Sequence, residues 1–322
     1  MTDRRAAPPS RLLLWVTLLI VATFTVLRFV TAATLDLRTD EAYYWSWAEQ
    51  YVLSYLDQPP MVAWIERLGL AIFGDTPLGA RFGQLLILPL IQLILADIAR
   101  RRTGSWNAAL FVVLALECTL NYGFFSIVVE PNLPLLLFVS AMLWCVLRLE
   151  ETDDPRWWLV IGVCFGLGLL SKFLILLLLP ALLMYAIISR LTTPWPYIAA
   201  LVAILIFSPV LVWNAQHGWA GVAFQGTRLG AGGDNNLFRF AVYEVLWLGP
   251  VLLITALAGT LALLASGLAR RDSYALLLGV AVVLPLAYLT WRSLGIQINQ
   301  SWSWFIWPSF FRGAVHLAAS DC

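Results

Sequence analysis

The chain has 322 residues, of which 61% are hydrophobic and only 12% are charged. A soluble domain carries about 25% charged residues, so the composition excludes an ordinary soluble globular protein. The 20 basic and 19 acidic residues give a formal net charge of +1, which offers no basic surface for nucleic acid. The four cysteines form no CxxC pair, so we expect neither a disulfide framework nor a zinc knuckle.

Apolar runs of about 20 residues, the length that crosses the hydrocarbon core of a bilayer, recur along the whole sequence. Because backbone groups in lipid must be hydrogen-bonded internally, we expect each run to be a helix. The sequence predicts nine transmembrane helices and a partial tenth, at residues 12–33, 78–99, 106–123, 131–149, 157–171, 173–189, 197–213, 238–266, 273–291 and 302–317. The expected fold class is therefore an all-α integral membrane protein, with residues 1–322 as a single polytopic domain.

Basic residues cluster in the short connections on one side of this arrangement, most densely in the three arginines at 100–102. The positive-inside rule then predicts a cytoplasmic N-terminus. The long connections, at residues 34–77, 124–130 and 214–237, are expected on the outer side. Because long structured loops usually carry function, we expect the functional site there.

The first outer connection has apolar and aromatic residues at helical spacing. This pattern predicts two short amphipathic helices along the membrane surface, at residues 40–51 and 60–73.

In the first of these helices, Asp40, Tyr43 and Tyr44 share one face, whereas Glu41 points about 100° away. A carboxylate beside aromatic rings suits a sugar site, because rings stack on sugar C–H faces and the carboxylate can accept a hydroxyl proton. The alternative is that Asp40 caps the helix and the rings form an interfacial belt.

Two more residues on the outer side are candidates for a site. Pro59 and Pro60 hold Asp57 in a defined place, where it either acts in the site or caps the second surface helix. Lys172 ends an apolar run of about 15 residues, only roughly 22 Å long, so we expect it to be recessed below the outer surface. An ammonium there is costly unless it meets an anion such as a lipid-linked phosphate, or unless the side chain snorkels to the headgroups.

The later outer connections add three candidates. Arg228 can form paired hydrogen bonds to a phosphate, and Glu130 supplies a carboxylate on the same side. His217 can bind a metal or donate to an oxyanion, or it is structural. A single histidine with scattered acids does not define a metal site, and no phosphate-binding glycine loop or hydrolase triad is present.

Five motifs, in order over roughly residues 36–230, resemble the membrane glycosyltransferases that use polyprenyl-phosphate sugars, the group of glycosyltransferase family 39 and the bacterial aminoarabinose transferases. They are Asp40-Glu41-Ala42-Tyr43-Tyr44-Trp45, Asp57-Gln58-Pro59-Pro60-Met61-Val62-Ala63-Trp64, Leu78-Gly79-Ala80-Arg81, Gly168-Leu169-Leu170-Ser171-Lys172 and Trp213-Asn214-Ala215-Gln216-His217-Gly218-Trp219. The resemblance implies a GT-C-type helical bundle in the bacterial inner membrane, with a periplasmic site. It also implies transfer of a sugar, with inversion, from a polyprenyl-phosphate donor to a lipid, glycan or protein acceptor.

The resemblance also implies roles for individual residues. Asp40 would be the catalytic base, with Glu41 as the next candidate, and Lys172 and Arg228 would bind the donor phosphate. Substrate-binding residues would be Tyr43, Tyr44, Asp57, Glu130 and His217. A divalent metal is a possible cofactor, with its ligands undefined.

Two departures from the family pattern keep other functions open. The sequence Pro131-Asn132-Leu133-Pro134 has Asn132 where the family commonly has Asp, and Gln58 stands where relatives often have His or Lys. Family members usually continue beyond the point where this chain ends in polar residues 312–322, which predicts a truncated chain and a catalytically incomplete pseudoenzyme as one alternative. A transporter or flippase of a lipid-linked solute is the other, although no inverted repeat is evident.

Overall fold

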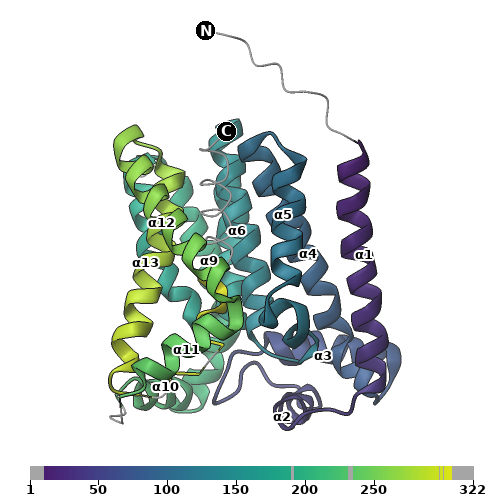
Figure 1. Ribbon diagram of the computed structural model, residues 1–322. Coiled ribbons are helices and arrows are strands. Elements are labelled where there is room, and N and C mark those ends of the chain that lie inside the picture. The colour runs from purple at the N-terminus through teal and green to yellow at the C-terminus, as the bar shows by residue number, and fades with distance from the viewer. Residues whose placement is uncertain (1–10, 190–191, 231–234, 297, 300, 307–322) are drawn as a thin grey trace.

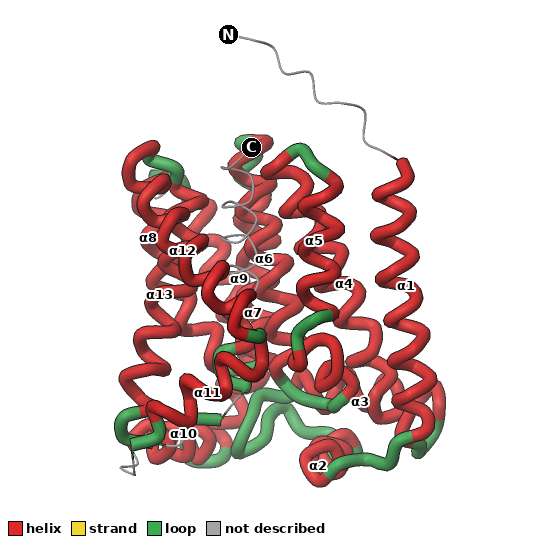
Figure 2. Tube along the Cα trace, viewed as in Figure 1, coloured by secondary structure: helices red, strands yellow, loops and turns green. Residues whose placement is uncertain are grey.

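The chain folds into a bundle of long helices with shorter helices packed across one end (Figure 1). The structure, a computed structural model, describes residues 11–189, 192–230, 235–296, 298–299 and 301–306. Throughout these residues it contains helices and no strand (Figure 2). The elements are α1 (Arg11–Thr34), α2 (Thr39–Ala48), α3 (Met61–Phe73), α4 (Pro77–Thr103), α5 (Trp106–Glu117), η1 (Leu120–Phe124), η2 (Phe125–Ile127), α6 (Asn132–Thr152), α7 (Trp157–Ser171), η3 (Phe173–Leu178), α8 (Leu179–Ser189), α9 (Trp195–Gln216), α10 (Ala220–Gly230), α11 (Leu237–Leu248), α12 (Pro250–Arg270), α13 (Ser273–Ser293) and η4 (Trp304–Ile306).

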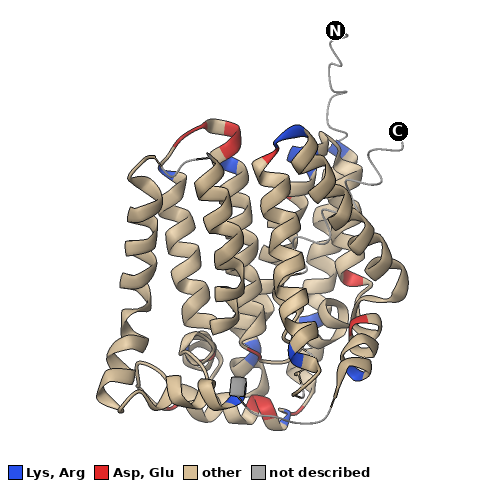
Figure 3. Cartoon of the chain, turned by 90° about the vertical axis from the view of Figure 1, so that its left-hand side faces the viewer, with Lys and Arg blue, Asp and Glu red and all other residues tan. Residues whose placement is uncertain are grey.

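The two ends of the bundle differ in structure. In Figure 1, helix α1 begins at the upper end, where the short connection between α4 and α5 also lies. Helices α2, α3 and α10 gather at the lower end. Figure 3 shows most of the charged residues toward these two ends. This arrangement, together with the apolar helices between the ends, is that of an integral membrane protein.

Within the described part of the chain, six helices are long and apolar enough to cross a membrane, namely α1, α4, α6, α9, α12 and α13. A seventh span is possible if α5 and the segment Leu120–Ile127, which are bent by 75° relative to each other, count as one. The predicted number of nine to ten spans is therefore not confirmed. Helix α7 and the η3–α8 pair are apolar but shorter, and the predicted partial span at 302–317 lies outside the described residues beyond residue 306.

The predicted span at 238–266 is wrong, because two helices occupy this segment. Helix α11 ends at Leu248 and α12 begins at Pro250. Between them Gly249 has a φ of +81°, a conformation that favours glycine, and the proline supplies a rigid first residue for the new helix. The predicted connection at 214–237 likewise contains a helix, α10, which the sequence does not predict.

Two short helices, α2 and α3, are present where the sequence predicts them. They pack against each other, and the rings of Trp47 and Tyr55 stack at 4.3 Å beside them. The Tyr55 hydroxyl donates a hydrogen bond of 2.6 Å to the carbonyl of Trp47. The loop that carries Asp57 is therefore fastened to the helix that carries Asp40.

A buried ion pair ties α1 to the bend after α5. Arg28 of α1 pairs with Glu117, and Gln92 of α4 donates a further hydrogen bond of 2.6 Å to the same carboxylate. Arg28 also donates to the carbonyl of Tyr122 and to the hydroxyl of Ser126. A buried charge is tolerated when it is paired and hydrogen-bonded in this way, so Glu117 is part of the scaffold.

Helices α7 and α9 approach each other closely at small residues. A Cβ atom on Gly162 would lie 2.4 Å from the carbonyl oxygen of Ala199, which leaves room for no side chain. Such close backbone contact is a common way for helices to pack in lipid, where the hydrophobic effect does not hold them together.

Candidate active site

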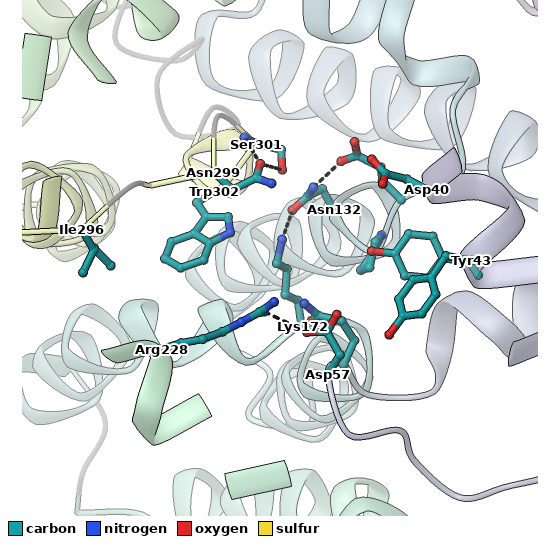
Figure 4. A pocket seen from close by; sticks show the side chains of 14 residues that line it. Asp40, Tyr43, Asp57, Asn132, Lys172, Arg228, Ile296, Asn299, Ser301 and Trp302 are labelled. Carbon is teal, nitrogen blue, oxygen red and sulfur yellow. Dashed lines mark hydrogen bonds and ion pairs between the residues drawn. The ribbon is translucent and has the colours of Figure 1, made fainter. Parts of the chain in front are cut away.

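A cavity of about 530 Å³ opens at the end of the bundle that carries α2 and α3 (Figure 4). Side chains from segments far apart in the sequence meet around it. The lining residues are Asp40, Tyr43, Tyr44, Asp57, Gln58, Glu130, Pro131, Asn132, Lys172, Arg228, Ile296, Asn299, Ser301 and Trp302. Seven of the nine residues predicted from the sequence are among them, so the structure brings most of the predicted set into one place.

Lys172 lies at the break between α7 and η3, outside both helices, and faces the first turn of α6. Its Nζ donates a hydrogen bond of 2.7 Å to the Asn132 side-chain oxygen, and the Asn132 amide nitrogen donates one of 2.6 Å to Glu130 (Figure 4). The side chain is buried, with 7% of Lys172 exposed, so the expectation that it is recessed is confirmed. An amide between the two charges keeps them near each other without a direct ion pair.

Burial shifts the titration of both charged groups in this chain of hydrogen bonds. It lowers the pKa of Lys172 to about 8, against the opposing effect of Glu130. It raises the pKa of Glu130, against the effect of Lys172 and of the Asn132 hydrogen bond. Lys172 is therefore a cation at neutral pH that has lost much of its water and can gain from an incoming anion.

Helix α10 carries Arg228 to the other side of the cavity. Arg228 forms an ion pair of 2.8 Å with Asp57, and Gln225 donates a hydrogen bond of 2.6 Å to the backbone carbonyl of Asp57. The guanidinium also lies over the ring of Phe224, and its side chain is 42% exposed. Arg228 is thus held near the cavity by a partner that is only partly buried.

Asp40 lies in the first turn of α2 and is exposed to the cavity beside two tyrosines. Tyr43 is 47% exposed, and its ring contacts those of Tyr44 and Trp47. Burial raises the pKa of the Tyr44 hydroxyl, with Glu130 and Asp57 adding to the effect. The hydroxyl therefore stays protonated and can donate a hydrogen bond.

Glu41, the second predicted catalytic residue, does not line the cavity. Its carboxylate is fully buried and forms two hydrogen bonds of 2.7 Å with the guanidinium of Arg81. It also accepts hydrogen bonds from the backbone N–H groups of Arg38 and Val129. Because every contact is with the protein itself, this geometry joins α2, α4 and the turn before Glu130 and leaves no group for a substrate.

His217 also lies outside the cavity lining. It follows the last residue of α9, is exposed, and stacks on Trp213 with ring centroids 4.2 Å apart. Its Nδ1 is 2.7 Å from the carbonyl of Trp213. Local contacts within one helix end therefore account for this side chain.

One group of lining residues, late in the chain, is not predicted from the sequence. Ile296, Asn299, Ser301 and Trp302 close one side of the cavity. Asn299 accepts hydrogen bonds of 2.9 and 2.8 Å from the backbone and the hydroxyl of Ser301. The available signal was the cluster of polar residues at 297–301, which precedes a run that we predicted to be a span.

The acids of the cavity do not make a metal site by themselves. Asp40, Asp57 and Glu130 all line it, yet over the part of the chain that is described no group of three or more His, Cys, Asp or Glu residues could hold a metal ion. Metal dependence stays a prediction, and no step below uses a metal.

Much of the chain is similar to known proteins. Residues 57–213 match the dolichyl-phosphate-mannose-protein mannosyltransferase family. The lipid A galacturonosyltransferase RgtD of Rhizobium johnstonii is 33% identical over 215 residues, which cover 62% of this chain and 43% of that protein. The resemblance predicted from the motifs is confirmed. The undecaprenyl phosphate-alpha-4-amino-4-deoxy-L-arabinose arabinosyl transferase of Edwardsiella ictaluri is 31% identical over 51% of this chain and 32% of its own.

Solved structures show the same fold. ArnT from Cupriavidus metallidurans, bound to undecaprenyl phosphate, superposes with a TM-score of 0.74 at 20% identity, over 95% of this chain and 60% of that one. The oligosaccharyltransferase of Archaeoglobus fulgidus superposes with a TM-score of 0.61 at 14% identity, over 96% of this chain and 49% of its own. The present chain thus spans only part of the length of these proteins and shares their helical membrane fold.

Proposed function

We propose that this chain carries the catalytic cavity of an inverting glycosyltransferase that moves a sugar from a polyprenyl-phosphate donor to a lipid or glycan acceptor. The observation that carries the proposal is the placement of Asp40, Lys172 and Arg228 around one cavity, although they come from α2, the end of α7 and α10. A base and two cations are what this reaction needs, because a proton must leave the acceptor while negative charge develops on the departing phosphate. The named relatives, which act on lipid A and on aminoarabinose, support the same class of donor and acceptor.

In the proposed step the acceptor hydroxyl or amine attacks the anomeric carbon from the face opposite the phosphate, which inverts the configuration. The bond from that carbon to the phosphate oxygen breaks, and the phosphate leaves with the electron pair. Asp40 takes the acceptor proton, while Lys172 and Arg228 stabilise the phosphate. In the view of Figure 4, Asp40 and Arg228 lie on opposite sides of Lys172, an arrangement that suits attack and departure at opposite faces.

The surrounding residues complete the proposed site. Tyr43, Tyr44 and Trp302 offer ring faces for sugar C–H groups, and Glu130 orients Lys172 through Asn132. We propose that Glu41 positions Asp40 without touching substrate and that His217 takes no part.

The membrane arrangement is also a proposal. A cytoplasmic N-terminus in a bacterial inner membrane would put α1's first residue and the arginines at 100–102 inside, and the cavity would then face the periplasm. Residues 1–322 would act as one polytopic unit. A protein acceptor and a divalent metal are options that no contact in the cavity favours.

The test is release of polyprenyl phosphate from a panel of polyprenyl-phosphate sugars by protein purified in detergent, where no gradient can drive transport. We expect wild type to release it and Asp40→Asn to lose roughly 10²–10⁴ of the rate, the usual contribution of a positioned base. Asp36→Asn is the matched control, because Asp36 is exposed near the same helix and lies outside the cavity.

Each outcome separates the alternatives. Donor binding without release would favour a pseudoenzyme. Donor transport into vesicles with no release would favour a flippase, and equal rates for wild type and Asp40→Asn would remove Asp40 from the proposed role.

A further inference from the structure

A second hollow lies between α7, α8 and α9, away from the candidate active site. It has a volume of about 310 Å³, and every side chain that lines it is apolar. It follows α7 from Trp158 to Leu169, a stretch of twelve residues or roughly 16 Å of helix. Small residues make the space, namely Ala186 of α8 and Ala200 and Ala203 of α9. We call it the α7–α9 groove.

A smaller cavity of about 200 Å³ lies between the α7–α9 groove and the candidate active site. Lys172 and Arg228 line both this cavity and the active site, so its polar end is the place proposed for the donor phosphate. Phe173, Leu174, Leu176 and Leu177 of η3 line one side of the remainder, and the other lining residues are Gln58, Gln225, Tyr288 and Trp302. Leu176 also lines the α7–α9 groove, so the three spaces follow one another from polar to apolar.

We infer that the α7–α9 groove holds the distal part of the donor's isoprenoid chain and thereby selects long carriers over short ones. The inference rests on the proposed function, since it needs the phosphate at Lys172. From there the chain leaves through the cavity lined by η3 and continues along α7. A short chain ends within the smaller cavity that η3 lines, whereas a long chain also fills the α7–α9 groove.

The occupant follows from the continuity of these spaces. A membrane phospholipid could fill an apolar groove, but its headgroup would have no reason to reach Lys172. A single long chain with one phosphate at its end matches a path that begins at a buried cation and is apolar from η3 onward. Because lipid and groove are equally apolar, the gain comes from van der Waals packing against the helices.

The test uses two probes without sugar, undecaprenyl phosphate and farnesyl phosphate, and measures the Kd of each in one detergent. Ala200 is an exposed residue of α9 that lines the α7–α9 groove, and it is distant in sequence from the residues that line the active-site cavity. Ala200→Trp therefore fills the groove without changing the active-site lining. We expect it to raise the Kd of undecaprenyl phosphate about tenfold and to leave that of farnesyl phosphate unchanged, because only the long chain makes the lost contacts. Leu201→Trp is the matched control, since Leu201 is 56% exposed on the same helix and lies outside the groove.

The outcomes distinguish this inference from the proposed function. If Lys172→Met weakens both phosphates while Ala200→Trp leaves the ratio of the two Kd values at the wild-type value, the phosphate site stands and the groove holds something else, such as an acyl chain of the membrane or of the acceptor. If Ala200→Trp raised the Kd of both probes by the same factor, the inference would also be overturned. Failure of wild type to bind either probe would overturn both proposals. Ala200→Leu gives a milder filling in case the tryptophan variant does not fold.

Discussion

Two arginine–carboxylate pairs lie close to the cavity and differ in almost every respect. Glu41 and Arg81 are both buried, with 0% and 2% of their side chains exposed, and they are joined by two hydrogen bonds of 2.7 Å. Asp57 and Arg228 are 19% and 42% exposed and are joined by one contact of 2.8 Å. Both members of the buried pair also form hydrogen bonds with backbone groups, whereas the exposed pair faces the cavity.

The difference shows how charge is used in this protein. A buried ion pair is shielded from water, so the protein itself must satisfy all of its hydrogen-bonding groups. Such a pair holds helices in place and has no free group that could bind a ligand. A half-exposed pair is worth little to stability and can exchange its partner for a phosphate. Neighbouring residues in the sequence, Asp40 and Glu41, therefore belong to different functional parts of the molecule.

The largest effect is expected when the buried pair is broken. Glu41→Gln leaves the Arg81 charge buried without its partner, which costs about 3–5 kcal/mol of folding stability. Thermal unfolding in detergent should show a much lower midpoint, with Glu49→Gln, an exposed acid at the end of the same helix, as the control. A variant as stable as wild type that has lost turnover would instead make Glu41 a catalytic residue.

Breaking the exposed pair should weaken the binding of the ligand and have little effect on folding stability. Arg228→Met removes a charged hydrogen-bond donor, so undecaprenyl phosphate should bind about tenfold more weakly, while the unfolding midpoint changes little. Arg239→Met, at an exposed arginine outside the cavity, should change neither. Unaltered affinity in the Arg228 variant would remove this residue from the phosphate site.

A smaller effect tests the titration of Lys172. Its pKa of about 8 means that the cation is lost as pH rises through that value. Between pH 7 and pH 9 wild type should lose up to about tenfold more affinity for undecaprenyl phosphate than Lys172→Arg, which stays charged. Comparing the two proteins cancels the titration of the ligand, and parallel pH curves would contradict the assignment.

The last prediction concerns the pH dependence of stability and rests on Glu66, a buried acid behind α2. Burial, with the nearby Glu41 charge, raises its pKa to about 9, and within the described residues neither of its oxygens has a hydrogen-bond partner. The unfolded chain releases this proton near pH 4.5 and the folded one near pH 9, so stability is fully present below the first value and falls as pH rises toward the second.

Glu66→Gln, which cannot ionise, should therefore raise the unfolding midpoint at pH 8 and leave it nearly unchanged at pH 5. The gain is at most about 1.4 kcal/mol per pH unit between the two pKa values. Equal midpoints for the two proteins at both pH values would contradict a protonated Glu66.

Much of the architecture could be predicted because it depends on local patterns. The apolar run 157–171 and the spacing of aromatic residues after Asp40 gave α7 and α2 with nearly the observed bounds. The break at Gly249 was missed because hydrophobicity continues through it. The Gly249-Pro250 pair was the available signal, since glycine followed by proline often ends one element and begins another.

The site was harder to predict than the helices. Helical periodicity correctly separated Asp40 from Glu41 by about 100°, yet it could not show that Arg81, forty residues later, would take up the second carboxylate. From the sequence, Asn132 stands where the family commonly has an Asp carboxylate. In the structure its side chain links Lys172 to Glu130 by hydrogen bonds. Contacts of this kind depend on how distant helices meet, which no local pattern records.

The most direct test of the account compares the release of polyprenyl phosphate per folded molecule by Asp40→Asn and by wild type, with the unfolding midpoint measured on the same samples. The account predicts an unchanged midpoint and a loss of roughly 10²–10⁴ in release rate. A folded Asp40→Asn protein that releases polyprenyl phosphate at the wild-type rate would contradict it.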